Sequence, residues 1–175
     1  MAIRILILAT LLLVSTAITA QTAVPDEYMI DTGDVIVIDV YNEKDLYVRT
    51  MVNAQGIVKL PLIGSISVSG KPPSVLESEI EAALFDGYLV EPDVSVTIEK
   101  YRPFYIKGAV KLPGVFDFRL NLTVEQAIAI GGGLRDRASK SDWYILRGAA
   151  QNKVRVKKDT PVFPGDILHI EESVF

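Results

Sequence analysis

The chain has 175 residues, of which 49% are hydrophobic, and 18 lysines and arginines against 22 aspartates and glutamates give it a net charge of −4. This mild acidity argues against nucleic acid as a partner. The sequence contains no cysteine and a single histidine. Disulfides, cysteine-based zinc sites and a lipid-modified N-terminal cysteine are therefore excluded. We expect core packing or contacts between subunits to hold the fold, without a metal or another cofactor.

The N-terminus has the pattern of a secretory signal peptide. Arg4 precedes an apolar run over residues 5–14, and small residues follow over 15–20. The run is shorter than the roughly 20 apolar residues that a transmembrane helix needs. We predict a signal peptide over residues 1–20, cleaved after Ala17 or Ala20, with an uncleaved anchor as the alternative. The remaining residues, about 155, suffice for one ordinary domain or two small ones.

Residues 21–100 predict a mostly β domain with one helix. Residues 35–38 are apolar on both faces, as in a buried strand, and further strands are expected at 57–60, 65–69 and 94–98. Prolines suited to a first helical turn precede apolar residues at helical spacing, and Gly87 can end this helix. Its expected core face consists of Val75, Leu76, Ile80, Ala83 and Leu84.

Residues 101–175 predict a second domain, again α+β. Strands are expected at residues 104–107, 115–120, 143–147, 153–157 and from 167 onward, with Phe116, Phe118 and Leu120 facing inward. A capping box formed by Thr123 and Gln126 begins a short helix over residues 124–130. Glycines 131–133 follow that helix and are interpreted as its end. A phosphate-binding loop would instead precede a helix.

One short pattern occurs in both domains. Gly33-Asp34 and Gly165-Asp166 each precede an apolar strand. Gly-Asp is a common turn pair, so convergent turn chemistry explains the repeat. We conclude only that each domain contains a strand that follows a tight turn.

No group of residues in the sequence indicates catalysis. The acidic residues Asp26, Glu27, Asp31, Asp34 and Asp39 could supply paired carboxylates, but they occupy turn and strand-edge positions, where aspartate has a structural role. His169 has no partners for a triad or a metal site. Lys153, Arg155 and Lys157 lie on one face of an expected strand, after Arg135, Arg137 and Lys140. This basic face could contact an anionic polymer or protect an edge strand, and both interpretations stay open.

Six sequence blocks resemble a known family. Residues 28–40 (Y-x-I-x-x-G-D-x-I-x-I-x-V), 56–70 and 87–98 resemble the polysaccharide export domain of bacterial outer-membrane export proteins. Residues 102–114, 122–133 and 164–170 resemble the soluble-ligand-binding β-grasp (SLBB) domain that follows it in this family. The motif positions, which we expect to be structural, are Tyr28, Gly33, Asp34, Gly56, Pro61, Gly64, Gly70, Gly87, Gly108, Pro113, Gly114, Gly165 and Asp166.

The resemblance implies a component of capsular or exopolysaccharide export, and no enzyme. Family members form homo-oligomeric rings that carry polysaccharide and work with an inner-membrane polysaccharide copolymerase. The sequence has neither the lipidated cysteine of many members nor the C-terminal amphipathic helix of larger ones. We therefore expect a short, non-lipidated periplasmic form, peripheral to the outer membrane, that cooperates with a separate outer-membrane β-barrel. The alternatives are a monomeric periplasmic glycan-binding module and a hydrolase or lyase that trims the polymer.

Overall fold

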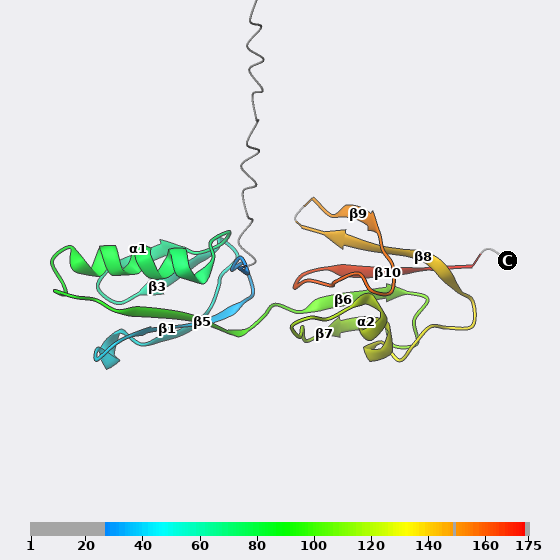
Figure 1. The fold of residues 1–175 in the computed structure, drawn as a ribbon, viewed down its shortest axis with the longest axis horizontal. Coiled ribbons are helices and arrows are strands. Elements are labelled where there is room, and N and C mark those ends of the chain that lie inside the picture. The colour runs from blue at the N-terminus through cyan, green and yellow to red at the C-terminus, as the bar shows by residue number, and fades with distance from the viewer. Residues whose placement is uncertain (1–26, 149, 174–175) are drawn as a thin grey trace, which may run out of the picture.

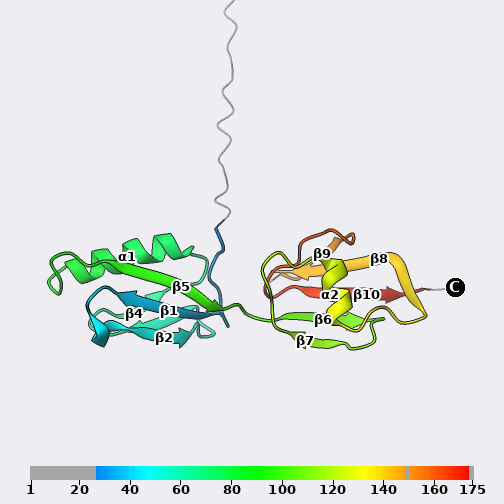
Figure 2. The ribbon, with the colours of Figure 1, turned by 60° about the horizontal axis from the view of Figure 1, so that its bottom comes forward.

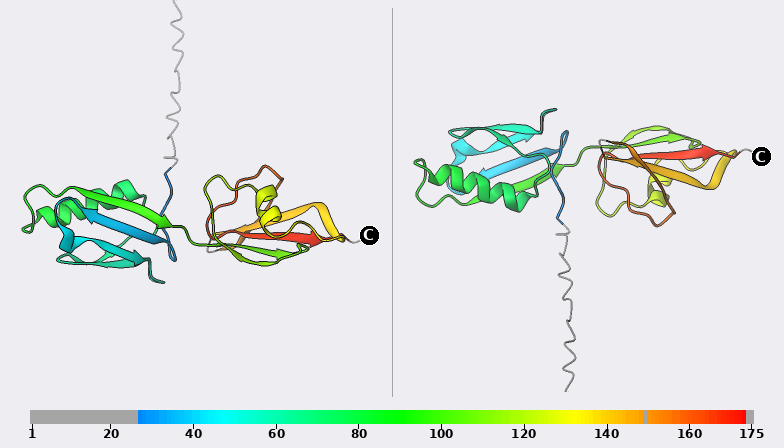
Figure 3. Two further views of the ribbon diagram at one scale, coloured as in Figure 1. Left: turned by 90° about the horizontal axis from the view of Figure 1, so that it is seen from below. Right: turned by 90° about the horizontal axis from the view of Figure 1, so that it is seen from above.

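The computed structural model describes residues 27–148 and 150–173, which form two modules joined end to end (Figure 1). The expected signal peptide and Asp26 lie outside the described residues. Each module has its own cluster of buried apolar side chains. The short segment of residues 101–103 connects them, and the two views of Figure 3 show a single link between the modules. The predicted α+β class, mostly β, is confirmed.

The first module combines a three-stranded antiparallel sheet with a two-stranded hairpin and one helix. The elements of this module are β1 (Val35–Val40), a 3-10 turn (Lys44–Leu46), β2 (Val48–Met51), β3 (Ile57–Leu60), β4 (Gly64–Ser67), α1 (Pro73–Phe85) and β5 (Val94–Lys100). The three-stranded sheet has the order β2-β1-β5, and the hairpin pairs β3 with β4. The expected strands and helix are confirmed, whereas β2 and the 3-10 turn were not predicted.

Helix α1 packs against the first module through one apolar stripe. Leu76, Ile80 and Leu84 are at most 2% exposed, at the i, i+4, i+8 spacing of a single helix face. Val75 was expected on this face, but it is 45% exposed, so that prediction is wrong. Val75 precedes Leu76 by one residue, which rotates it about 100° away from the buried stripe.

Two glutamates of α1 cover the outer edge of β5. Glu77 accepts a hydrogen bond from the backbone N–H of Val96 at 2.8 Å, and Glu81 accepts one from Val94 at 3.2 Å. These N–H groups point away from β1, the strand that pairs with β5 on the other side. Helix α1 lies beside β5 (Figure 2). Its two glutamates therefore satisfy part of an edge that would otherwise be open to pairing with another strand.

The second module is a five-stranded mixed sheet crossed on one face by a short helix (Figure 2). Its elements are β6 (Phe104–Gly108), β7 (Gly114–Phe116), α2 (Val124–Ile130), β8 (Ala138–Arg147), β9 (Asn152–Arg155) and β10 (Ile167–Glu172). The strand order is β7-β6-β10-β8-β9, and among the described strands of this sheet only β6 and β10 pair in parallel. The predicted capping box of Thr123 and Gln126 is confirmed at the start of α2.

Three strand predictions in the second module need correction. The strand expected at residues 153–157 ends at Arg155, so Lys157 lies beyond it instead of sharing a strand face with Lys153 and Arg155. The strand expected at residues 115–120 ends at Phe116, and Leu120 is 66% exposed instead of buried. Phe116 and Phe118 do pack against the core, as expected. Alternation of apolar and polar residues continues past Phe116, but only three residues find pairing partners on β6. The strand expected at 143–147 begins earlier, at Ala138.

Gly108 marks a close approach between the two parallel strands. Its φ of +89° lies in the left-handed region, and a Cβ added there would lie 2.0 Å from the carbonyl oxygen of Ile170. No side chain fits between β6 and β10 at this point, so the position requires glycine. In the described part of the chain, no helix has both the length and the hydropathy needed to cross a membrane.

Candidate functional site

The two modules meet at an ion pair between Asp34 and Arg102. Asp34 directly precedes β1 and is fully buried, while Arg102 lies in the connecting segment. The Arg102 backbone N–H donates to Asp34 Oδ1 at 2.7 Å, and its Nη1 donates to Oδ2 at 3.1 Å. The backbone N–H of Asp31 donates to Oδ2 as well, at 2.8 Å. These donors satisfy a carboxylate that burial would otherwise penalise strongly.

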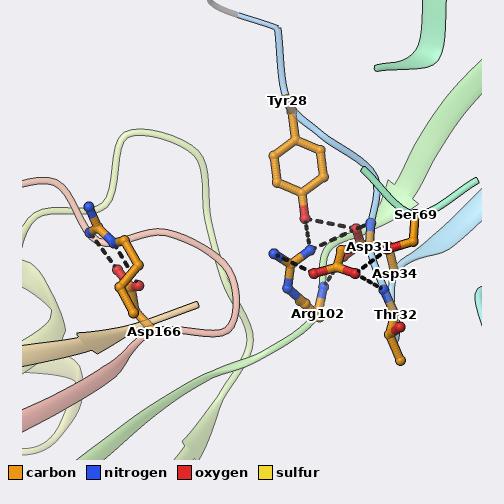
Figure 4. Close-up of polar contacts among 8 residues, drawn as sticks. Tyr28, Asp31, Thr32, Asp34, Ser69, Arg102 and Asp166 are labelled. Carbon is orange, nitrogen blue, oxygen red and sulfur yellow. Dashed lines mark hydrogen bonds and ion pairs between the residues drawn. The ribbon is translucent and has the colours of Figure 1, made fainter. Parts of the chain in front are cut away.

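Tyr28 completes this cluster from the N-terminal side (Figure 4). Its hydroxyl donates to Asp34 Oδ2 at 2.7 Å and accepts from Arg102 Nη1 at 2.5 Å. Burial, followed by the hydrogen bond to Asp34 and the charge of that residue, raises the pKa of Tyr28 well above its ordinary value. The phenol therefore stays protonated and acts as a donor. We call Tyr28, Asp31, Asp34 and Arg102 the joint cluster.

Aromatic rings extend the contact from the joint cluster into the second module. Tyr28 meets Tyr101 edge-on, with ring centroids 4.9 Å apart and an interplanar angle of 89°. Tyr101 meets Phe118 in the same manner at 5.5 Å. Phe118 in turn packs against the core of the second module. Edge-to-face pairs of this kind stabilise beyond their buried area, so the rings tie the N-terminal segment to both modules.

Asp31 adds a second carboxylate to the joint cluster. It accepts from the Ser69 hydroxyl at 2.6 Å and from the Thr32 backbone N–H at 2.8 Å, and it lies 3.5 Å from Arg102 Nη2. Partial burial acts to raise the pKa of Asp31, but the two hydrogen bonds and the Arg102 charge outweigh it and lower the pKa. The carboxylate is therefore ionised at neutral pH.

Asp166 repeats the Asp34 arrangement in the second module. It is 1% exposed and pairs with Arg147 through Nε at 2.9 Å and Nη2 at 2.7 Å. The backbone N–H of Phe163, three residues earlier, also donates to it at 2.8 Å, as Asp31 does to Asp34. The interpretation of the Gly-Asp repeat as turn chemistry alone is therefore too narrow. Each repeat is a turn built around a buried carboxylate with an arginine partner.

The glycines of both Gly-Asp turns lie against Arg102. A Cβ added at Gly165 would lie 2.9 Å from Arg102 Nε, and one added at Gly33 would lie 3.4 Å from Arg102 Cβ. The Gly165 N–H also donates to the carbonyl of Pro103 at 3.0 Å. The arginine thus fits between two turns from different modules, and this packing restricts how the modules can rotate relative to each other.

A groove of about 490 Å³ lies where β8 begins and the chain leaves β9. We call it the basic groove, and its lining residues are Lys140, Ser141, Trp143, Arg155, Val156, Lys157 and Lys158. Arg155 and Lys157, two of the three basic residues singled out in the sequence, line it. The third, Lys153, lies outside it, 3.3 Å from Glu171 and over the ring of Tyr144 at 3.9 Å.

Comparison with known proteins gives the family. The model for polysaccharide biosynthesis/export proteins matches residues 22–99, and the SLBB domain model matches residues 103–161. The chain belongs to the polysaccharide export family. Among its relatives, exopolysaccharide production protein ExoF of Rhizobium meliloti (strain 1021) is 33% identical over 109 residues. The chain spans only 26% of the length of that relative, and 60% of this chain is covered.

Three of the acidic residues noted in this export-family sequence, Glu27, Asp31 and Asp34, have structural partners. Asp31 and Asp34 both contact Arg102. Glu27 accepts from the backbone N–H of Ser74 at 3.3 Å and from its hydroxyl at 2.8 Å, so it caps the first turn of α1 from 47 residues away. Asp39 is exposed on β1. Sequence reasoning missed both the Glu27 cap and the Arg102 ion pair, because their partners are remote in the chain.

The remaining export-family motif residues lie at turns and strand ends. Left-handed φ angles occur at Gly56, Gly64, Gly70 and Gly87, while Pro61 follows β3 and Pro113 precedes β7. Gly114 is the first residue of β7. His169 Nε2 is 3.8 Å from Glu171, and no group of three or more possible metal ligands occurs within residues 27–148 and 150–173.

Proposed function

We propose that the protein is a non-enzymatic component of capsular or exopolysaccharide export, located in the periplasm and peripheral to the outer membrane. The observation that carries the proposal is the order of the two family matches, with the export model at residues 22–99 directly followed by the SLBB model at 103–161. A relative named for exopolysaccharide production supports the choice of polymer. In this role the protein supplies a conduit and no energy.

The proposed conduit requires several copies of the chain. One chain of two small modules cannot surround a polymer, whereas a closed ring of identical copies can. The outer edge of β2 is available for such contacts, because β2 pairs with β1 on one side only among the described strands. The joint cluster would hold the two modules of each copy in one orientation, so that both form successive layers of the ring. An inner-membrane copolymerase and a separate outer-membrane partner would complete the path.

Deletion of the gene in a producing strain tests this proposal. We expect secreted polymer to fall sharply while polymer accumulates in the cell, and complementation to restore secretion. Light scattering of the purified protein should show a multimer. Unchanged secretion in the deletion strain, or a strictly monomeric protein at every concentration and in the presence of polymer, would contradict the conduit.

A glycan-binding module without a conduit is the second candidate. The basic groove favours it, because this groove belongs to a single chain and needs no ring. The two candidates differ in one outcome: a monomer that binds glycan while its deletion leaves secretion intact supports the binding module. Incubation of polymer with the purified protein should leave the polymer length unchanged, and shortening would indicate a hydrolase or lyase instead.

A further inference from the structure

Charge is divided unequally between the two modules. Residues 1–100 carry 6 lysines and arginines against 14 aspartates and glutamates, a net charge of −8. Residues 101–175 carry 12 against 8, a net charge of +4. The second module is therefore basic, although the chain as a whole is mildly acidic. Four of its twelve basic side chains, Lys140, Arg155, Lys157 and Lys158, gather in the basic groove.

The four basic side chains of the groove differ in how they are neutralised. Arg155 Nη2 lies 2.7 Å from Asp142, and Lys158 lies 3.4 Å from Glu125. Lys140 and Lys157 are exposed, and the described part of the chain places no carboxylate within ion-pair distance of either ammonium group. Two uncompensated positive charges on the rim of one groove create a local attraction for anions.

The floor of the groove is apolar. Trp143 and Val156 line it and are 4% and 5% exposed. The indole N–H of Trp143 donates to the carbonyl of Ser139 at 2.7 Å, which fixes the ring in place. The groove volume of about 490 Å³ is within the range of small-molecule sites. An apolar floor beneath a cationic rim suits a sugar ring, whose C–H groups pack on apolar surface, when that ring carries a carboxylate. A free phosphate would gain nothing from the floor.

We propose that the basic groove is a subsite for acidic sugars of the exported polymer, such as uronic acids. Lys140 and Lys157 bind the carboxylate, and the Trp143 and Val156 side chains contact the ring. The acidic first module repels the same polymer, so contact is confined to the second module. This assignment rests on the proposed export function and names the class of polymer that the function serves.

Binding of defined oligosaccharides to the purified full-length protein tests the subsite. The probes are a galacturonic acid trimer and a neutral trimer of glucose, measured by calorimetry at low and at raised salt. The acidic trimer should bind more tightly, and salt should weaken its binding because ionic contacts at an exposed groove are screened. The double variant Lys140→Gln, Lys157→Gln should bind it about three- to tenfold more weakly.

A matched control separates the groove from the charge of the whole module. Lys153→Gln removes one positive charge outside the groove and should leave the affinity unchanged. All the substituted side chains are exposed, and circular dichroism should show unaltered folding. Equal binding of the neutral trimer, equal loss in Lys153→Gln, or equally tight binding of polyphosphate or single-stranded DNA through the same lysines would overturn the subsite.

The deletion strain distinguishes failure of the subsite from failure of the export proposal. Lost secretion together with no binding of the acidic trimer would overturn the subsite alone. Intact secretion together with lysine-dependent binding would overturn the export function, and with it the assignment of the groove to an exported polymer. Lost secretion together with lysine-dependent binding supports both.

Discussion

Arg102 binds Asp34 through its main chain and its side chain at once. The backbone N–H and the guanidinium reach different oxygens of one buried carboxylate, at 2.7 and 3.1 Å. The start of β1 and the segment between the modules are therefore fixed to each other at two points. The joint cluster should therefore affect both the stability of the protein and the relative orientation of its two modules.

Arg102→Ala should destabilise the first module by about 3 kcal/mol, because it leaves the Asp34 carboxylate buried without its charged partner. Hydrogen exchange of the β1 amides measures this loss locally. Small-angle scattering should show a wider range of intermodule orientations. Arg49→Ala is the matched control: Arg49 pairs with Glu99 on the surface, and its loss should cost less than about 1 kcal/mol. Equal effects of the two variants would contradict the role of the joint cluster.

Tyr28 should make stability sensitive to alkaline pH. Its pKa is raised on folding, so its contribution is fully present below the ordinary value of 10.0 and is lost as pH rises above it, where the unfolded phenol ionises first. Urea unfolding on either side of that pH should show that the free energy of unfolding falls more steeply with pH in the native protein than in Tyr28→Phe. Parallel pH profiles of the two proteins would show that the phenol is not held protonated.

Asp31 has the opposite dependence. Its pKa is lowered on folding, so its contribution is present above the ordinary value of 3.8 and is lost as pH falls through the lower value of the folded state. Asp31→Asn should therefore flatten the acidic limb of the stability profile. It should change the alkaline limb only slightly, because the Asp31 charge is the smallest of the causes that raise the pKa of Tyr28. An alkaline change as large as that of Tyr28→Phe would contradict this order of causes.

Glu77→Ala combined with Glu81→Ala should weaken the first module by about 1 kcal/mol for each lost hydrogen bond. It should also increase aggregation, because two N–H groups on the outer edge of β5 become open to other strands. Urea unfolding and light scattering over time measure the two effects. Glu79→Ala is the control, since Glu79 pairs with Lys71 instead of covering β5. Aggregation of the control at the same rate would exclude edge protection.

Gly108→Ala should destabilise the second module by about 2–4 kcal/mol, because strain at positive φ adds to a clash with the backbone of Ile170. Gly133→Ala isolates the first effect, since Gly133 has a φ of +87° with nothing within 4 Å of an added Cβ. Its cost should be about 1 kcal/mol. Tryptophan fluorescence of Trp143 during urea unfolding measures both. Equal losses of stability in the two variants would show that the close approach of β6 and β10 does not require glycine at position 108.

Local patterns predicted the elements better than their partners. The capping box and apolar spacing of α2 indicated its bounds, because both signals lie within the helix itself. Strand β2 was missed, since its four residues alternate too briefly to be recognised. Leu120 was expected inside, although no neighbouring strand pairs with residues past Phe116. Arg102 lies 68 residues from Asp34, and sequence spacing cannot show such a contact. The Gly-Asp repeat indicated two turns, but it did not show that each turn contains a buried carboxylate.

The position of β10 has a consequence for how the second module folds. This strand comes last among the described strands, yet it lies between β6 and β8 at the middle of the sheet. Until it arrives, the hairpins β6–β7 and β8–β9 have no strand to join them, and their apolar faces stay uncovered. Pairing of β6 with β10 also spans most of the module, which slows folding. While the chain is still incomplete, this module is therefore the one that exposes apolar surface and unpaired strand edges for longest.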